Sequence, residues 1–115
     1  MKSPITTHVL DTSRGCAAEG IRVTLEKESK PSVWKKLGQD ITDADGRCNK
    51  IVSPRTQLSK GTYRLTFDTA RYFELNRVQS FYPYVTVSFA VRAARAHYHV
   101  PLLLSPFGYS TYRGT

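Results

Sequence analysis

The sequence predicts an all-β fold, a sandwich of two packed sheets with one short helix. Short segments of alternating apolar and polar residues recur along the chain, turn residues separate them, and a single segment has helical spacing. At 115 residues the chain is long enough to enclose one hydrophobic core. We therefore expect a single domain over residues 1–115.

The first half of the chain contains three predicted strands. Alternation in the first of them places Thr6 and His8 on one face, and in the second it turns Val23 and Leu25 inward. Turns rich in Asp, Ser, Gly and Pro separate the three strands. In chain order they are Ile5–Leu10, Ile21–Lys27 and Trp34–Thr42.

The second half contains four predicted strands and the helix. Tyr72, Phe73 and Asn76 recur at helical spacing, and Asp68 or Thr69 stands in the N-cap position. The strands are Gly61–Phe67, Tyr84–Arg92, His97–Leu104 and Tyr109–Tyr112, and the helix is Asp68–Asn76.

Composition and charge narrow the class of protein and its partners. The longest apolar runs are a few residues, far short of the ~20 that a membrane helix needs, so we expect no membrane partner. Seventeen basic against nine acidic residues give a net charge of +8, which attracts anions. The basic residues are scattered, and we expect no nucleic-acid partner. A small anionic ligand in a positive cleft fits the same charge.

The two ends and the two cysteines bear on the compartment. MKSPITTH lacks the apolar segment of a signal peptide, and YRGT matches no common retention or peroxisomal tripeptide. We expect a cytoplasmic protein, with the peroxisome as the alternative. Cys16 and Cys48 have no metal-binding spacing, and we expect both to be reduced thiols.

The segment from His97 to Thr115 carries the most informative pattern. On a strand, His97 and His99 point to one side and Tyr98 to the other, so packing can anchor one face while the other presents imidazoles. The polar tail that starts at Tyr112 directly follows a strand that reads as buried. We expect this tail to be held in place, although such tails are often disordered.

The three histidines, His8, His97 and His99, leave three interpretations open. They can be structural, or they can transfer protons, because imidazole titrates near neutral pH. They can also bind zinc in an open catalytic geometry, which a His-x-His pair and a remote third histidine permit. The sequence contains no GxSxG motif, glycine-rich phosphate loop or paired carboxylates that would indicate another chemistry.

The segment Asp43–Arg47, DADGR, predicts a tight turn. It resembles the start of a calcium-binding loop, but the glutamate expected at position twelve of such a loop falls on Pro54, which cannot coordinate calcium through its side chain. Gly46 supplies the positive φ of the turn. Arg47 then projects from a defined place, where its guanidinium suits the oxygen edges of a small ligand. The alternative is a solvated arginine at the start of a strand.

Five segments together resemble the transthyretin-related family of 5-hydroxyisourate hydrolases. They are HVLDTSRG at 8–15, TDADGR at 42–47, YRLTFDTARYF at 63–73, FYPYVTVSF at 81–89 and HYHVPLLLSPFGYSTYRG at 97–114. The resemblance implies a transthyretin-like β-sandwich of two four-stranded sheets with one short helix. It also implies a homotetramer, a dimer of dimers, whose channel holds active sites built from adjoining subunits. The implied reaction hydrolyses 5-hydroxyisourate to 2-oxo-4-hydroxy-4-carboxy-5-ureidoimidazoline in urate breakdown, with no metal or cofactor.

The same resemblance implies the site residues. The catalytic set is His8, Arg47 and His99, and substrate binding involves His8, Arg47, Tyr112, Arg113, Gly114 and Thr115. We expect Arg47 to hold the substrate while one histidine activates water and the other orients it or protonates the departing ring nitrogen. The family usually ends in serine, so Thr115 keeps the hydroxyl and carboxylate but adds a methyl group.

A transthyretin-like carrier of small aromatic ligands is the alternative to an enzyme. Binding of aromatic ligands in an apolar carrier channel does not require the set His8, Arg47 and His99, so we favour the enzyme.

Overall fold

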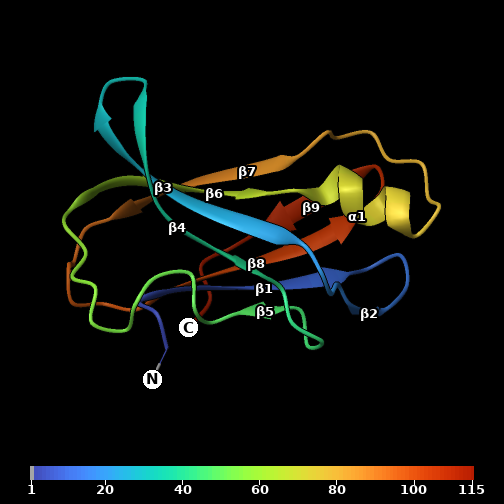
Figure 1. The fold of residues 1–115 in the computed structure, drawn as a ribbon, viewed down its shortest axis with the longest axis horizontal. Helices are drawn as coiled ribbons and strands as arrows, with labels where there is room; N and C mark the ends of the chain where they lie inside the picture. Colours follow the sequence, from blue (N-terminus) through green and yellow to red (C-terminus); the bar gives the residue numbers. More distant parts are fainter. Residues whose placement is uncertain (1) are drawn as a thin grey trace.

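The computed structural model describes residues 2–115, and it confirms the all-β prediction with one short helix. Figure 1 shows the strands in two layers, with the helix near one end of the molecule. In chain order the elements are β1 (Ile5–Asp11), β2 (Cys16–Ala17), β3 (Arg22–Lys30), β4 (Val33–Ile41), β5 (Arg47–Cys48), β6 (Gly61–Phe67), α1 (Thr69–Leu75), β7 (Val85–Val91), β8 (Tyr98–Ser105) and β9 (Gly108–Thr111).

The two sheets differ in how their strands run. The first has the order β2-β1-β8-β9, with β5 also paired to β1, and the second has the order β4-β3-β6-β7. β1 and β8 run parallel, from the partners Ile5 and Tyr98 to the partners Asp11 and Leu104. All the other strand pairs are antiparallel. The parallel pair joins the two ends of the chain side by side, which positions the candidate site.

The first sheet has five strands where the resemblance implied four, and two of the five, β2 and β5, are only two residues long. Neither segment was among the predicted strands, because two residues are too few to show alternation, although a strand starting at Arg47 was one of the two interpretations of that residue. β5 pairs with Thr7 and His8, and β2 pairs with Leu10 and Asp11, so the two strands follow one another beside β1. The helix prediction is confirmed to within one residue at each end.

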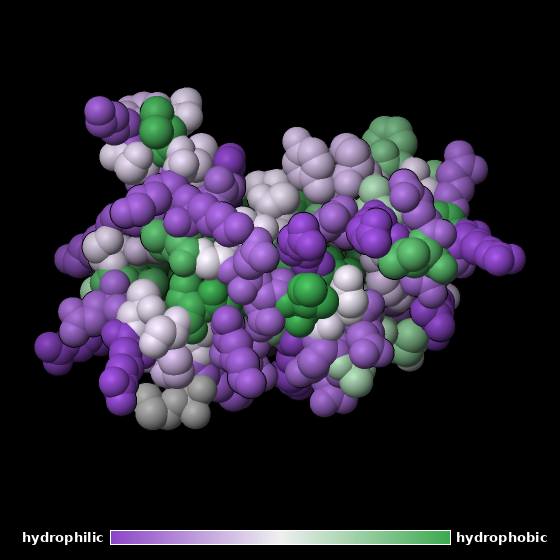
Figure 2. Space-filling model, in the orientation of Figure 1, coloured by the Kyte–Doolittle hydropathy of each residue, from purple (hydrophilic) through white to green (hydrophobic). Residues whose placement is uncertain are grey.

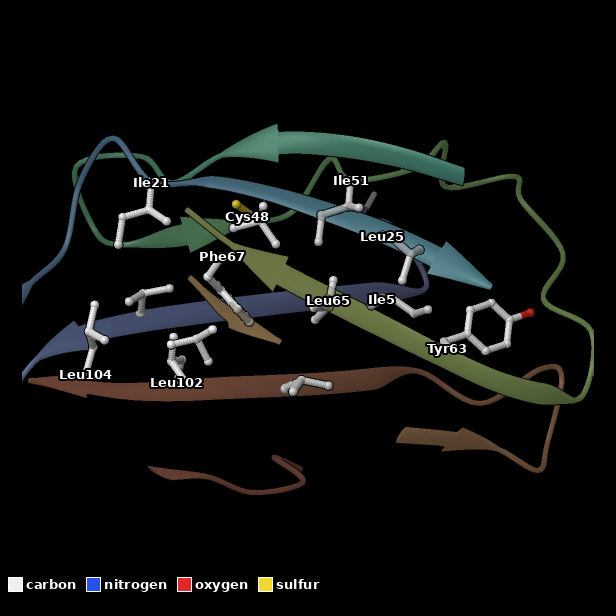
Figure 3. Close-up of a cluster of buried hydrophobic side chains, with 14 of the residues drawn as sticks. Ile5, Ile21, Leu25, Cys48, Ile51, Tyr63, Leu65, Phe67, Leu102 and Leu104 are labelled. Carbon is white, nitrogen blue, oxygen red and sulfur yellow. The ribbon is translucent and has the colours of Figure 1, made fainter. Parts of the chain in front are cut away.

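The core lies between the sheets, where inward side chains of both layers meet (Figure 3). Ile5 and Leu102 come from the first sheet, Leu25 and Leu65 come from the second, and all four are fully buried. Burying a side chain of this size stabilises a fold by about 1.5–3 kcal/mol. The inward direction predicted for Val23 is confirmed, since it is also fully buried.

Asp11 fastens the end of β1 to α1. Its carboxylate accepts hydrogen bonds from the Tyr72 hydroxyl at 2.7 Å and from the Ser13 hydroxyl at 2.6 Å. Burial raises the pKa of the Asp11 carboxyl, but these bonds and those from the backbone N–H groups of Ser13 and Arg14 outweigh it, so the pKa is lowered. A charged Asp11 therefore holds the helix against the first sheet.

The surface seen in Figure 2 is largely hydrophilic. Within residues 2–115, the structure has no helix of the length and apolar character needed to cross a membrane. Both thiols are free, as expected, with Cys16 exposed and Cys48 buried.

Candidate active site

The register of three neighbouring strands gathers the predicted residues on the outer face of the first sheet. Thr6 on β1 is the partner of His99 on β8, and His8, two residues further along β1, is the partner of Arg47 on β5. Paired residues point to the same face, and so do residues two apart on a strand. With strands about 4.8 Å apart and a rise of about 3.3 Å per residue, the Cα atoms of His8 and His99 lie roughly 8 Å apart.

The two histidines of the HYH segment meet at one hydroxyl. Thr6 Oγ1 lies 2.7 Å from His99 Nδ1 and 3.0 Å from His97 Nε2. This confirms that His97 and His99 share a face, and Tyr98 between them is buried. The contact leaves Nε2 of His99 without a protein partner among residues 2–115, where it can take a proton from water.

His8 is held by the turn that precedes β5. Its Nε2 lies 2.8 Å from the backbone carbonyl oxygen of Asp45. A carbonyl oxygen can only accept, so this nitrogen carries the proton and donates it. In the neutral ring the lone pair is then on Nδ1, which makes Nδ1 the atom through which His8 can act as a base.

Arg47 projects from a turn with the predicted geometry. The Asp43 carboxylate accepts hydrogen bonds from the backbone N–H groups of Asp45 and Arg47, each at 2.9 Å. Gly46 has a φ of +77°, and a Cβ there would collide with the carbonyl oxygen of Val9. The turn therefore needs glycine both for its backbone angle and for its close approach to β1. It starts β5 at Arg47, whose side chain is exposed.

Burial and positive charge act together on His99. The pKa of its imidazole is lowered first by burial and then by the charges of Arg47, His8, His97 and Lys2. A lowered pKa keeps the ring neutral, and able to accept a proton, at a more acidic pH than an ordinary histidine. By contrast, hydrogen bonds from backbone N–H groups, that of Arg47 first, lower the pKa of the Asp43 carboxyl.

The C-terminal tail returns to His99, as expected for a tail held in place. The Gly114 N–H donates to the His99 carbonyl oxygen at 2.8 Å, and the two residues form an isolated β-bridge. A Cβ on Gly114 would lie 2.6 Å from Cδ2 of the His99 ring. The tail thus lies so close to the imidazole that any larger residue at position 114 would displace the ring or the tail.

Arg113 is not brought together with the histidines within one chain. Its guanidinium carbon lies 4.7 Å from the centre of the Tyr98 ring, on the side of β8 opposite His99. Arg113 and Tyr112 line a groove of about 320 Å³ with residues of β7 and β8. The reason is the bridge between Gly114 and His99, because the residue next to Gly114 faces the other way. Thr115 is exposed beyond this bridge.

Two residues that organise this site were not among the predicted ones. They are Thr6, whose hydroxyl joins two imidazoles, and Asp45, whose carbonyl orients His8. Alternation along β1 already put Thr6 on the face of His8, and that was the available signal. Within residues 2–115, no three His, Cys, Asp or Glu side chains are grouped so that they could hold a metal ion.

Comparison with known proteins shows the family. A profile of the HIUase/Transthyretin family matches residues 5–114. The chain belongs to the HIUase/Transthyretin family. A mouse 5-hydroxyisourate hydrolase is 46% identical to this family member over 114 residues, which cover 98% of this chain and 96% of the mouse protein.

Solved structures of both branches of the family share the fold. A Klebsiella pneumoniae 5-hydroxyisourate hydrolase matches with a TM-score of 0.83 and 33% identity, covering 96% of this chain and 98% of the other. Sea bream transthyretin in complex with thyroxine matches with a TM-score of 0.89 and 27% identity, covering 97% of this chain and 95% of the transthyretin chain. Since the mouse hydrolase is 46% identical to this chain over almost its full length and the sea bream carrier is 27% identical, this member of the HIUase/Transthyretin family is a hydrolase.

Proposed function

We propose that the chain hydrolyses 5-hydroxyisourate to 2-oxo-4-hydroxy-4-carboxy-5-ureidoimidazoline in purine catabolism. The observation that carries the proposal is the convergence of His8, Arg47 and His99 on one face of three adjacent strands. Two proton-transfer groups and one fixed cation are what the hydrolysis of a cyclic amide with an oxygen-rich ring requires. The names of the mouse and Klebsiella relatives support the same substrate.

In the proposed mechanism, His99 is the base that activates water. Its Nε2 takes a proton from water while the oxygen adds to a ring carbonyl carbon. The bond from that carbon to the ring nitrogen then breaks, the nitrogen receives the proton that was taken from water, and the carboxylic acid that forms loses its own proton to solvent to give a carboxylate. The lowered pKa of His99 favours the base role, because the ring stays neutral near pH 7. His8, with its lone pair on Nδ1, orients the water or carries a proton to or from the ring.

Arg47 binds the substrate and stabilises the negative oxygen that forms during attack. Its backbone is fixed through Asp43, so the guanidinium starts from a defined position. Planar paired N–H donors match the oxo and imide edges of the substrate ring. A preorganised donor at a developing oxyanion contributes about 10²–10³ in rate.

We also propose a homotetramer whose sites combine residues of adjoining subunits. β7 and β9 each lie at the end of a sheet, and such unpaired edges can pair with the same strand of a second copy. Tyr112 and Arg113 face this side of the molecule, so in an assembly they would serve a neighbouring site or shape the channel. Light scattering after gel filtration should give four times the 13.0 kDa chain mass. A monomer at micromolar concentration would contradict this part of the proposal.

The location of the protein stays a prediction. We propose the cytoplasm, with the peroxisome as the alternative, and cell fractionation tests it.

The deciding experiment follows the ultraviolet band of freshly made 5-hydroxyisourate. We expect the protein to accelerate decay of the band well beyond the spontaneous rate, at catalytic concentration. A transthyretin-like carrier would instead retain the ligand stoichiometrically and leave its decay rate unchanged or slower. That second result would overturn the proposed reaction and leave only the fold.

A further inference from the structure

One hydroxyl group lies between two imidazoles on the outer face of the first sheet. Thr6 Oγ1 contacts Nδ1 of His99 at 2.7 Å and Nε2 of His97 at 3.0 Å. Thr6 is only 2% exposed, His99 is half-buried and His97 is exposed. The three groups thus form a line of hydrogen bonds that runs from a partly buried ring to the solvent.

Few hydrogens are available for the hydrogen bonds between Thr6 and the two imidazoles. A hydroxyl has one hydrogen to donate and otherwise accepts, so Thr6 can donate to only one of the two facing nitrogens. The other nitrogen must then donate its own N–H to the Thr6 oxygen. When both rings are neutral, one of the two facing nitrogens carries a hydrogen and the other does not. The tautomer of His99 is therefore set by the state of His97.

We propose that Thr6 and His97 form a proton relay for His99, an inference that rests on the proposed hydrolysis. In the ready state, Nδ1–H of His99 donates to Thr6 and the Thr6 hydroxyl donates to Nε2 of His97. As Nε2 of His99 takes a proton from water, its Nδ1 proton passes to Thr6 and the Thr6 proton passes to His97. His99 ends neutral in its other tautomer, and His97 carries the charge. Protonation of the departing ring nitrogen by Nε2–H of His99 reverses each transfer, so no net proton remains.

Electrostatics favours this route over a charged His99. Its ring is partly buried, and Arg47 on β5 and Lys2 near the N-terminus place positive charge around it, to which His8 on β1 and His97 just before β8 add when they are protonated. A charge formed on His99 would be buried and repelled by these groups, whereas a charge on the exposed ring of His97 is in contact with water. Thr6 and His97 act through His99 and are positioning residues.

The relay has a consequence for pH that a purely structural threonine does not have. When His97 binds a proton from solvent, its Nε2–H donates to Thr6, and Thr6 must then donate to Nδ1 of His99. His99 is forced into the Nε2–H tautomer, which cannot accept a proton from water. Protonation of His97 therefore switches His99 off, although His97 does not touch the reacting atoms.

The test compares Thr6→Val, Thr6→Ser and the control Thr7→Val. Thr7 is on the same strand and equally buried, but it faces the core and donates to the Val100 carbonyl oxygen at 2.5 Å. Both valine variants lose a buried hydroxyl, so both carry a similar stability loss. We expect Thr6→Val to lose about 10- to 100-fold in kcat, part of the ~10²–10⁴ that proton transfer contributes, with Thr6→Ser restoring most of it. Thr7→Val should keep the wild-type rate. Equal losses in the two valine variants, or none in Thr6→Val, would overturn the relay.

A second measurement needs no substrate and separates the relay from the proposed reaction. Nitrogen-15 NMR of the imidazoles reports which ring nitrogen carries hydrogen. In the wild type and Thr6→Ser, Nδ1 of His99 should lose its hydrogen as His97 becomes protonated, and in Thr6→Val this linkage should vanish. A His99 tautomer that ignores the titration of His97 in the wild type would refute the relay. If the linkage is present but hydroxyisourate decay is not accelerated, the relay geometry stands and the proposed substrate is wrong.

Discussion

The outer faces of the two sheets are built by the same alternation of side chains, but their arginines have different partners. On the second sheet, Nε of Arg64 on β6 lies 2.8 Å from the carboxylate of Glu26 on β3, which makes an ion pair. The guanidinium carbon of Arg64 lies 4.1 Å from the centre of the Trp34 ring. On the first sheet, the structure records no ion pair within 4.0 Å for Arg47 among residues 2–115. Its neighbours His8 and His99 bond to a carbonyl oxygen and a hydroxyl rather than to carboxylates.

The difference shows where the fold leaves charge available for a ligand. A paired arginine is already neutralised and adds little beyond packing. An arginine with no carboxylate partner can direct its positive charge at an anionic or oxygen-rich ligand that enters the site. The second face therefore supports the sandwich, and the first supports the chemistry. Variants of the first face, and of the tail that lies against it, test this difference when each is compared with a matched control elsewhere in the chain.

The largest effect is expected from His99→Ala. Removing the base should lower kcat by about 10³, within the range of ~10²–10⁴ for general acid–base catalysis, while the circular dichroism spectrum stays that of the wild type. Thr86→Ala, on the outer face of the second sheet, should keep full activity because Thr86 contacts only Thr66 through its side chain hydroxyl. A fully active His99→Ala would remove His99 from the mechanism.

The next effect compares two arginines, one on each face. Arg47→Lys should lower kcat/KM by about 10², because an ammonium cannot reproduce the paired donors at the oxyanion. Arg64→Lys should stay within about twofold of the wild type, since a partly exposed surface ion pair contributes only ~0–1 kcal/mol to stability. Steady-state kinetics of both variants gives the comparison. Similar losses in both would mean that the two faces are not functionally distinct.

A smaller effect is expected from Gly114→Ala. The added methyl group would lie 2.6 Å from the His99 ring, so either the ring or the tail must move. We expect kcat to fall about tenfold, less than the ~10² that a displacement of a full ångström can cost. Gly108→Ala, at the start of β9, has its nearest contact at 3.7 Å and should be neutral in the same assay. If Gly114→Ala is equally neutral, contact of the tail with His99 has no role in turnover.

The smallest effect is expected on the pKa of the His99 imidazole. Because the pKa of His99 is lowered, the neutral form of its ring persists below the ordinary value of about 6.5, and the ring itself should bind a proton only at more acidic pH. Removing the nearby charge with Arg47→Gln should raise the pKa of His99 towards its ordinary value. Arg64→Gln should leave it unchanged. Proton NMR titration of the His99 ring tests the direction, and a lower pKa in Arg47→Gln would contradict the electrostatic account.

Local features of the site followed from sequence pattern. The two-residue period of a strand placed His97 and His99 on one face, and their shared contact with Thr6 confirms it. The DADGR segment predicted a tight turn, and Gly46 has the positive φ that such a turn requires. These features depend on a few neighbouring residues, so a single chain segment contains enough information to specify them.

The orientation of the tail could not be predicted in the same way. Family resemblance grouped Arg113 with the histidines, but within one chain its guanidinium lies over Tyr98. The direction of Arg113 depends on which residue of the tail pairs with β8, and Gly114 is that residue. A register shift of one would have turned the arginine to the other face.

The sequence by itself determined the helix, the longer strands, the inward residues and the kinds of side chain available for chemistry, because these depend on periodicity and turn composition over short distances. Only the tertiary structure decided that β1 runs parallel to β8 and that β5 lies on the other side of β1, which brings His8, His99 and Arg47 together. Those pairings join residues some ninety positions apart for the two histidines. They arise from burying the inner faces of both sheets at once, a requirement that no local pattern expresses.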